Sequence, residues 1–119
     1  MSESLNLIVE SLHLLGDVRA RRMFGGYGLF LDGLMFGLVA DEVLYFKVDS
    51  GNRPDFDAAG LSPFLYQRQG KDIALSYCQA PPEVLEDSEL ARQWGAAAYA
   101  AAQRSRKTAP AKTRAKHRN

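Results

Sequence analysis

The 119-residue sequence has little of what would point to a specialised class of protein. It contains a single cysteine, Cys78, so no internal disulfide can form and a disulfide-rich secreted scaffold is excluded. No run approaches the roughly 20 consecutive apolar residues that cross a bilayer, and no basic segment precedes the first apolar stretch as it would in a signal peptide. We therefore expect a soluble, cytoplasmic protein that does not associate with membranes.

Residues that usually carry catalysis or bind metals are also scarce. The two histidines, His13 and His117, have no partner at a spacing that suits zinc, so we predict no metal site. The sequence has no GxSxG motif, and Cys78 lies in an alternating stretch typical of a structural thiol. We predict a protein without a cofactor or catalytic residues, and a small enzyme of unrecognised type stays open as a third hypothesis.

The charges are unevenly distributed along the chain. Of the fifteen Lys and Arg residues, seven follow Gln103, whereas all fourteen Asp and Glu residues precede it. We therefore divide the chain into an acidic domain at residues 1–102 and a basic, flexible tail at residues 103–119, whose composition buries too little apolar area to fold. The candidate nucleic-acid contacts are the basic residues of the tail: Arg104, Arg106, Lys107, Lys112, Arg114, Lys116 and Arg118. The tail could neutralise phosphates or only keep the protein in solution, and the sequence leaves both interpretations open.

Apolar periodicity predicts one helix and then four strands in the first half of the chain. Apolar residues from Leu5 to Leu15 recur at helical spacing, and Gly16 can end this helix. Short apolar runs between Arg19 and Val48 predict the strands, which form a meander. They are separated by three turn signals: Gly25-Gly26, Asp32-Gly33 and Asp41-Glu42.

The second half adds a short helix, a hairpin and a last helix. The short helix begins at Asn52 as its N-cap, and the hairpin over residues 64–78 turns at Gly70-Lys71. The last helix is capped by Asp87 or Ser88 and presents a stripe of small residues that can pack closely. The order predicts an α+β fold: an antiparallel sheet of about six strands, a β-meander plus a hairpin, with N-terminal, middle and C-terminal helices packed on it.

The segment RRMFGGYG at 21–28 is the most unusual part of the sequence. Its glycines begin a GxGxxG pattern, but Leu31 stands at the third position and no helix follows, which argues against a dinucleotide loop. Glycine inside a strand instead predicts a bulge or a close backbone approach. Alternation places Arg19 and Arg21 on one face of the strand and Arg22 on the other.

We predict that this segment contacts another protein, because arginine and aromatic residues are favoured at interface hot spots. Internal ion pairs of the arginines are the alternative. The candidate surface consists of Arg21, Arg22, Phe24, Gly25, Gly26, Tyr27 and Gly28.

The same segment carries a family resemblance. Residues 5–102, and most specifically RMFGGYG at 22–28 followed by MF at 35–36 and LYFKV at 44–48, resemble the N-terminal domain of the bacterial TfoX/Sxy competence regulators. The resemblance implies an α+β domain with an antiparallel sheet, no established enzymatic activity and no cofactor. The best-known members act with a cyclic-AMP receptor protein on competence promoters and carry a C-terminal domain, for which this chain has no room. The resemblance therefore implies a stand-alone regulatory or protein-interaction module whose partner is a transcription factor or another protein.

Overall fold

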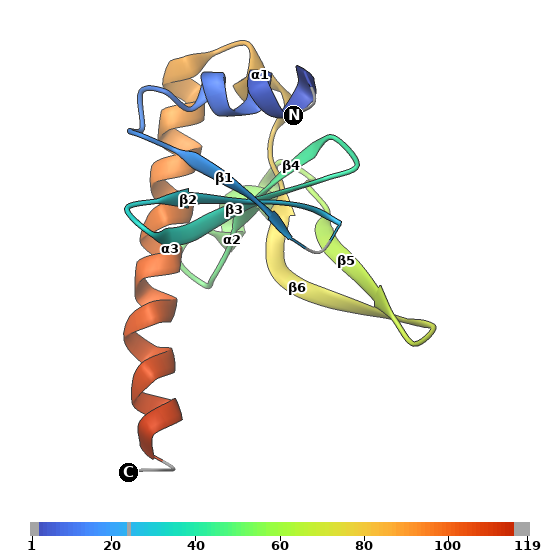
Figure 1. The fold of residues 1–119 in the computed structure, drawn as a ribbon, viewed down its shortest axis with the longest axis vertical. Coiled ribbons are helices and arrows are strands. Elements are labelled where there is room, and N and C mark those ends of the chain that lie inside the picture. Colours follow the sequence, from blue (N-terminus) through green and yellow to red (C-terminus); the bar gives the residue numbers. More distant parts are fainter. Residues whose placement is uncertain (1–2, 24, 116–119) are drawn as a thin grey trace.

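The computed structural model is an α+β structure in which the helices gather on one side of a twisted sheet (Figure 1). It describes residues 3–23 and 25–115, with the side chains of residues 66–68, 71–74 and 107–115 outside the description. The elements are α1 (Glu3–Ser11), β1 (Arg19–Met23), β2 (Gly26–Leu31), β3 (Leu34–Ala40), β4 (Val43–Lys47), α2 (Arg53–Ala58), β5 (Pro63–Arg68), β6 (Lys71–Gln79), a 3-10 turn η1 (Pro82–Leu85) and α3 (Ser88–Ala115). The predicted fold class is confirmed.

The six strands form one antiparallel sheet in the order β1-β2-β3-β4-β6-β5. Asp32-Gly33, with φ of 51° and 79°, and Asp41-Glu42, with φ of 50° and 66°, are the tight turns that the sequence predicted. The second hairpin turns one residue earlier than predicted, at Gln69-Gly70, whose φ values are 54° and 78°. Arg68 pairs with Lys71, which leaves only these two residues in the turn.

The strand register separates two faces of the sheet, because residues paired across antiparallel strands share a face. Leu29, Gly37 and Phe46 are successive partners on one face, and this face carries the hydrophobic core. Figure 1 shows α3 passing behind the strands on that side, with no helix across the front. We call the two sides the helix-covered face and the open face. The side chains of the open face include Arg21, Met23, Phe30, Met35, Leu38, Tyr45, Lys47 and Tyr77.

Helix α3 packs closely on the sheet through small residues. A Cβ at Gly95 would lie 3.1 Å from Leu15 Cδ2 and 3.3 Å from Leu12 Cδ2, so a larger residue would have to displace these side chains by a few tenths of an ångström. The Asp87 carboxylate accepts the Leu90 N–H at 3.0 Å, which confirms one of the two predicted caps. The predicted stripe consists of Leu90, Trp94, Ala97, Ala98 and Ala101. Ala98 and Ala101 are fully buried, and Leu90 and Trp94 pack partly buried against the core.

The backbone of α3 continues to Ala115, further than the sequence analysis drew it. The domain boundary at residue 102 and the flexibility of residues 103–119 stay predictions.

The first helix ends earlier than predicted, at Ser11 rather than just before Gly16. The Leu12 N–H bonds the Val9 carbonyl and the Leu15 N–H bonds the Leu12 carbonyl, so the chain tightens into three-residue turns. This tightening accompanies the complete burial of Leu12, which the helical spacing did predict.

Asn52 stands at the N-cap position of α2, but the predicted side-chain cap is wrong. Its Oδ1 accepts the Asp49 N–H at 2.8 Å, and its Nδ2 donates to the Lys47 carbonyl at 2.9 Å. A buried amide must satisfy both its donor and its acceptor, and here the preceding loop offers both partners. Asn52 therefore shapes the loop between β4 and α2 instead of capping the helix.

An ion pair between Asp49 in this loop and Arg104 connects the C-terminal half of α3 to the loop that follows β4. Arg104 donates from Nε to Asp49 Oδ2 at 2.6 Å and from Nη2 to Oδ1 at 2.8 Å. The Gly51 N–H donates to the same carboxylate at 2.8 Å. Arg104 is the main cause that lowers the pKa of Asp49 to about 2. Gly51 makes room for this pair, since a Cβ there would lie 2.6 Å from Arg104 Nη2.

Alanine at Gly26 should destabilise the fold more than alanine at Gly28 on the same strand. A Cβ at Gly26 would stand 2.1 Å from the Val39 carbonyl oxygen, which the sheet holds in place, whereas the nearest atom at Gly28 is the movable Met23 Sδ at 2.5 Å. We expect Gly26→Ala to lose about 1–3 kcal/mol of unfolding free energy in urea titrations, and Gly28→Ala clearly less. Equal losses would contradict the register of β2 against β3.

Substitution of Arg104 should change how the free energy of unfolding depends on pH. Because the pKa of Asp49 falls from 3.8 to about 2 on folding, the ion pair stabilises the fold above pH 3.8 and this contribution is lost as the pH falls towards 2. Urea unfolding of the Arg104→Gln variant should therefore lose less stability over this range than the parent protein. The control Arg22→Gln removes an arginine without an ion pair among the described residues and should keep the parent's pH dependence.

Candidate functional site

The open face carries a cluster of sulfur and aromatic side chains above Gly28. A Cβ at Gly28 would lie 2.5 Å from Met23 Sδ, 3.0 Å from Phe30 Cε1 and 3.1 Å from Met35 Sδ, so these side chains close over bare backbone. This close approach is one of the two reasons that the sequence predicted for glycine here. All three side chains are half-buried, and methionine adapts its shape readily at binding surfaces. We call Met23, Phe30 and Met35 the methionine–phenylalanine cluster.

Two arginines of β1 lie over aromatic rings on opposite faces of the sheet. The Arg21 Cζ is 5.4 Å from the centre of the Phe30 ring, and the Arg22 Cζ is 5.9 Å from the centre of the Tyr27 ring. The predicted alternation of the arginines is therefore confirmed. Cation–π contacts of this kind at exposed sites contribute about 0.5–1 kcal/mol and leave most of each guanidinium available to solvent.

Internal ion pairing, the alternative role for these arginines, applies to Arg19 only. Arg19 pairs with Asp17 at 2.9 Å. Within the part of the chain that the structure describes, neither Arg21 nor Arg22 forms an ion pair. Both are exposed, so this edge of the sheet presents two cations that no described carboxylate holds in an ion pair.

The predicted surface at 21–28 is thus divided by the sheet. Arg21 and Gly28 belong to the open face, whereas Arg22 and Tyr27 lie at the edge of the helix-covered face. Gly25, with φ of 76°, makes the bend between the strands, and Phe24 lies outside the described residues. The sequence analysis missed Phe30 and Met35 as neighbours of Arg21, although the two-residue period of β2 offered a signal for Phe30.

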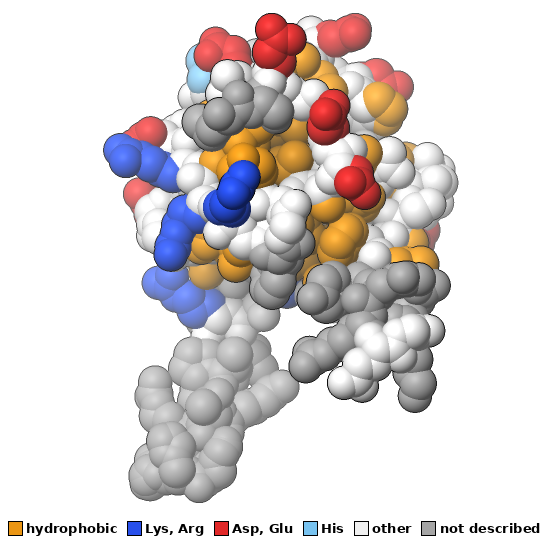
Figure 2. Space-filling model, turned by 45° about the vertical axis from the view of Figure 1, so that its right-hand side comes forward, with side chains coloured by type: hydrophobic (Ala, Val, Ile, Leu, Met, Phe, Trp, Pro, Cys, Tyr) orange, Lys and Arg blue, Asp and Glu red, His pale blue; other side chains and the backbone are white. Residues whose placement is uncertain are grey.

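Figure 2 shows how charge surrounds this surface. Hydrophobic side chains, in orange, occupy the middle of the view, with Lys and Arg in blue on the left and most of the Asp and Glu in red above. The hydrophobic centre is therefore bordered by charges of opposite sign on different sides.

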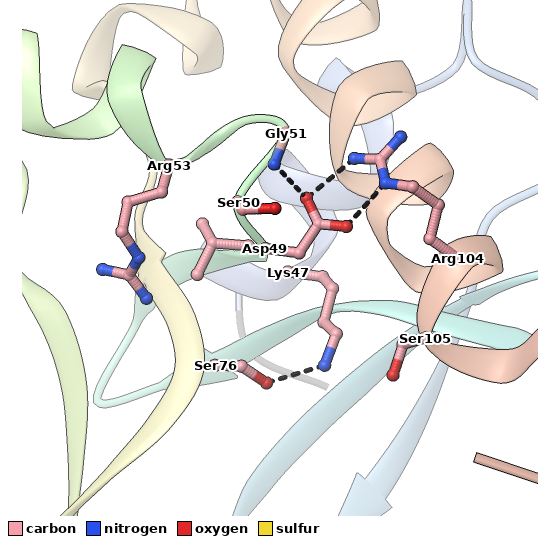
Figure 3. A pocket seen from close by; sticks show the side chains of 9 residues that line it. Lys47, Asp49, Ser50, Gly51, Arg53, Ser76, Arg104 and Ser105 are labelled. Atoms are coloured by element: carbon pink, nitrogen blue, oxygen red, sulfur yellow. Dashed lines mark hydrogen bonds and ion pairs between the residues drawn. The ribbon is translucent and has the colours of Figure 1, made fainter. Parts of the chain in front are cut away.

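A second candidate site is a polar hollow of about 930 Å³ where β4, β6, the loop before α2 and α3 meet (Figure 3). Among the described residues that line it, Asp49 is the one acid. The polar side chains around it are Lys47, Ser50, Arg53, Ser76, Arg104 and Ser105. No local pattern in the sequence indicates this hollow, because its lining comes from three separate stretches of the chain: 47–53, 76 and 104–105.

Two cations of the hollow have partners other than carboxylates. Lys47 donates to Ser76 Oγ at 2.6 Å and lies 5.4 Å from the centre of the Tyr77 ring, and burial lowers its pKa. Arg53 Nη1 lies 3.8 Å from Cys78 Sγ. Among the described residues, neither Lys47 nor Arg53 forms an ion pair.

The cysteine and the potential metal ligands do not form a catalytic or metal site among the described residues. Cys78 is 1% exposed, and burial raises the pKa of its thiol, so it is a core residue as its alternating strand indicated. Across residues 3–23 and 25–115, no cluster of at least three His, Cys, Asp or Glu side chains is arranged to hold a metal ion. No helix in these ranges has the length and apolar character needed to cross a membrane.

The predicted nucleic-acid contacts are only partly described. Arg104 is engaged with Asp49, and Arg106 is exposed on α3. The remaining five lie outside the described side chains: Lys107, Lys112, Arg114, Lys116 and Arg118.

Comparison with known proteins gives a family but no named relative. The family model of the TfoX N-terminal domain matches residues 10–102, which include every strand of the sheet and the segment 21–28. A search of curated proteins finds no match. Because the family model covers most of the sequence, the chain belongs to the TfoX N-terminal domain family.

Proposed function

We propose that this chain is a non-enzymatic regulatory module that binds another protein through its open face and the neighbouring edge strand β1. Membership of the TfoX N-terminal domain family supports a regulatory, competence-related domain at the family level. The observation that carries the proposal is the methionine–phenylalanine cluster beside Arg21, on the face of the sheet opposite the hydrophobic core, where α3 borders only the end near Met35. In the proposed role, the partner is a transcription factor that controls genes for DNA uptake.

The chemistry of the edge favours an acidic partner. Arg21 and Arg22 carry charge without an ion pair among the described residues, and the β1 segment itself contains no acidic residue. β1 is also the first strand of the sheet, with β2 as its one neighbouring strand. An acidic segment could approach this edge with complementary charge, while apolar side chains next to it enter the methionine–phenylalanine cluster.

Reversal of the two unpaired charges should abolish partner binding without unfolding the domain. In cross-linking pull-downs from cells of the source species, quantified by mass spectrometry, the Arg21→Glu/Arg22→Glu variant should retain roughly a tenth or less of the specific partner. Arg92→Glu changes an arginine on the exposed part of α3 and should retain it. Recovery of the same partners by the double variant and the parent, at equal thermal stability, would exclude this surface.

A second candidate function is nucleic-acid binding through the basic end of α3. The observation that favours it is that the helix continues through the basic segment to Ala115 and projects beyond the sheet (Figure 1). A basic helix that stands away from an acidic body could lie along phosphates without bringing the body's acids close to them.

Truncation after Arg106 tests this second function while keeping the Asp49–Arg104 pair. The full chain should bind duplex DNA at low salt and lose affinity as salt rises, with a log–log slope that decreases by roughly 0.9 for each phosphate contact removed by truncation. Fluorescence anisotropy at two salt concentrations measures both effects. If the truncated and full chains bind alike, the basic end of α3 has no such function.

A further inference from the structure

The polar hollow between β4, β6 and α3 holds more positive than negative charge. Lys47, Arg53 and Arg104 line it, against the single carboxylate of Asp49. Figure 3 shows Arg104 directed at Asp49 and Lys47 reaching to Ser76, while Arg53 lies on the opposite side of Asp49 from Arg104 and turns its guanidinium away from that carboxylate. The hollow therefore combines one neutralised cation with two others.

The Asp49–Arg104 pair explains why the acid does not cancel the charge of the whole hollow. Both oxygens of Asp49 accept hydrogen bonds from Arg104, and one of them also accepts the Gly51 N–H. This carboxylate is thereby committed to Arg104 and to the backbone. Lys47 instead contacts the Ser76 hydroxyl, and Arg53 contacts only the Cys78 sulfur among the described groups.

We propose that this hollow binds a phosphate group, with Lys47 and Arg53 as its cationic contacts and Ser76 as a hydroxyl donor. Charge-assisted hydrogen bonds to an anion are stronger than those that Lys47 and Arg53 now make to a hydroxyl and a thiol. A tetrahedral phosphate can accept bonds from several directions, which suits donors that come from β4, α2 and β6.

Burial supports the proposal at Lys47. Partial desolvation disfavours its ammonium and lowers its pKa, and the nearby Asp49 carboxylate offsets this effect only in part. Among the described residues, no carboxylate lies within ion-pair distance of Lys47. An anion bound in the hollow would compensate this desolvation. Arg21 and Arg22 of β1 are exposed to solvent, so their charges do not carry the cost of desolvation that Lys47 carries.

NMR titration of the full chain with inorganic phosphate, at constant ionic strength, tests the site. We expect the amide signals of Gly51, Ser76 and their neighbours to shift, and Lys47→Gln and Arg53→Gln each to weaken binding about tenfold. Arg92→Gln removes a positive charge outside the hollow and should leave the affinity within about twofold. Absence of shifts at the hollow, or equal weakening by all three variants, overturns the proposal.

A variant that should strengthen phosphate binding shows that the losses in the other variants do not come from unfolding. Asp49→Asn keeps the shape of the side chain but removes the negative charge and loosens its hold on Arg104, so phosphate affinity should rise several-fold. Glu10→Gln removes an acid on α1, away from the hollow, and should change the affinity little. Unchanged or weaker binding by the folded Asp49→Asn variant counts against the site.

The source of the phosphate is decided by adding a nucleoside monophosphate or a short DNA duplex to the same titration. A free phosphate ester as ligand predicts stronger binding of the monophosphate than of inorganic phosphate, with no gain for DNA. A nucleic-acid phosphate predicts the reverse and requires the basic end of α3. In either case the Arg21→Glu/Arg22→Glu variant should bind phosphate like the parent protein. A negative result for the phosphate site is therefore independent of a negative result for the protein-interaction surface.

Discussion

The close packing of α3 against β3 is the constraint on which the rest of the structure depends. Phe36 is fully buried, and its ring stacks 6.4 Å from the Phe46 ring and meets Tyr99 edge-on at 6.1 Å. Gly95 lets the helix approach close enough for Leu12 and Leu15 to share this contact. Because the apolar surfaces of the helices are used here, the opposite face of the sheet keeps its methionines and several aromatic rings half-buried, and this is the face at which we propose that a partner binds.

Local signals in the sequence predicted most of this architecture. Asp32-Gly33 and Asp41-Glu42 tolerate positive φ, so they fix the hairpins of the meander, and the alanine stripe identifies the helix that packs on the sheet. The errors occur where a tertiary contact overrides a local preference. Asn52 is a good N-cap residue by propensity, but burial beside the Lys47 carbonyl gives its amide two backbone partners instead.

The candidate sites were less predictable than the fold, for a related reason. Alternation within β1 correctly separates Arg21 from Arg22, but only the pairing with β2 places Phe30 under Arg21 and Tyr27 under Arg22. The polar hollow depends on contacts between segments far apart in the sequence, since Asp49 and Arg104 come from opposite halves of the chain. Residue types alone carry no information on such a meeting.

The described cations fall into two groups that stabilise the isolated chain differently. Arg19, Arg92 and Arg104 each pair with a carboxylate, and the last of these connects α3 to the loop before α2. Arg21, Arg22, Lys47, Arg53 and Arg106 have no ion pair among the described residues, and all of these but Arg106 lie at the two candidate sites. A cation without a counter-ion contributes little to folding and repels its neighbours, and at Lys47 it is also partly desolvated. The contacts that Arg21, Arg22 and Lys47 make to aromatic rings are weaker than charge-assisted hydrogen bonds to an anion, which is why the edge of β1 and the polar hollow, rather than the paired arginines, are the places to test for ligands.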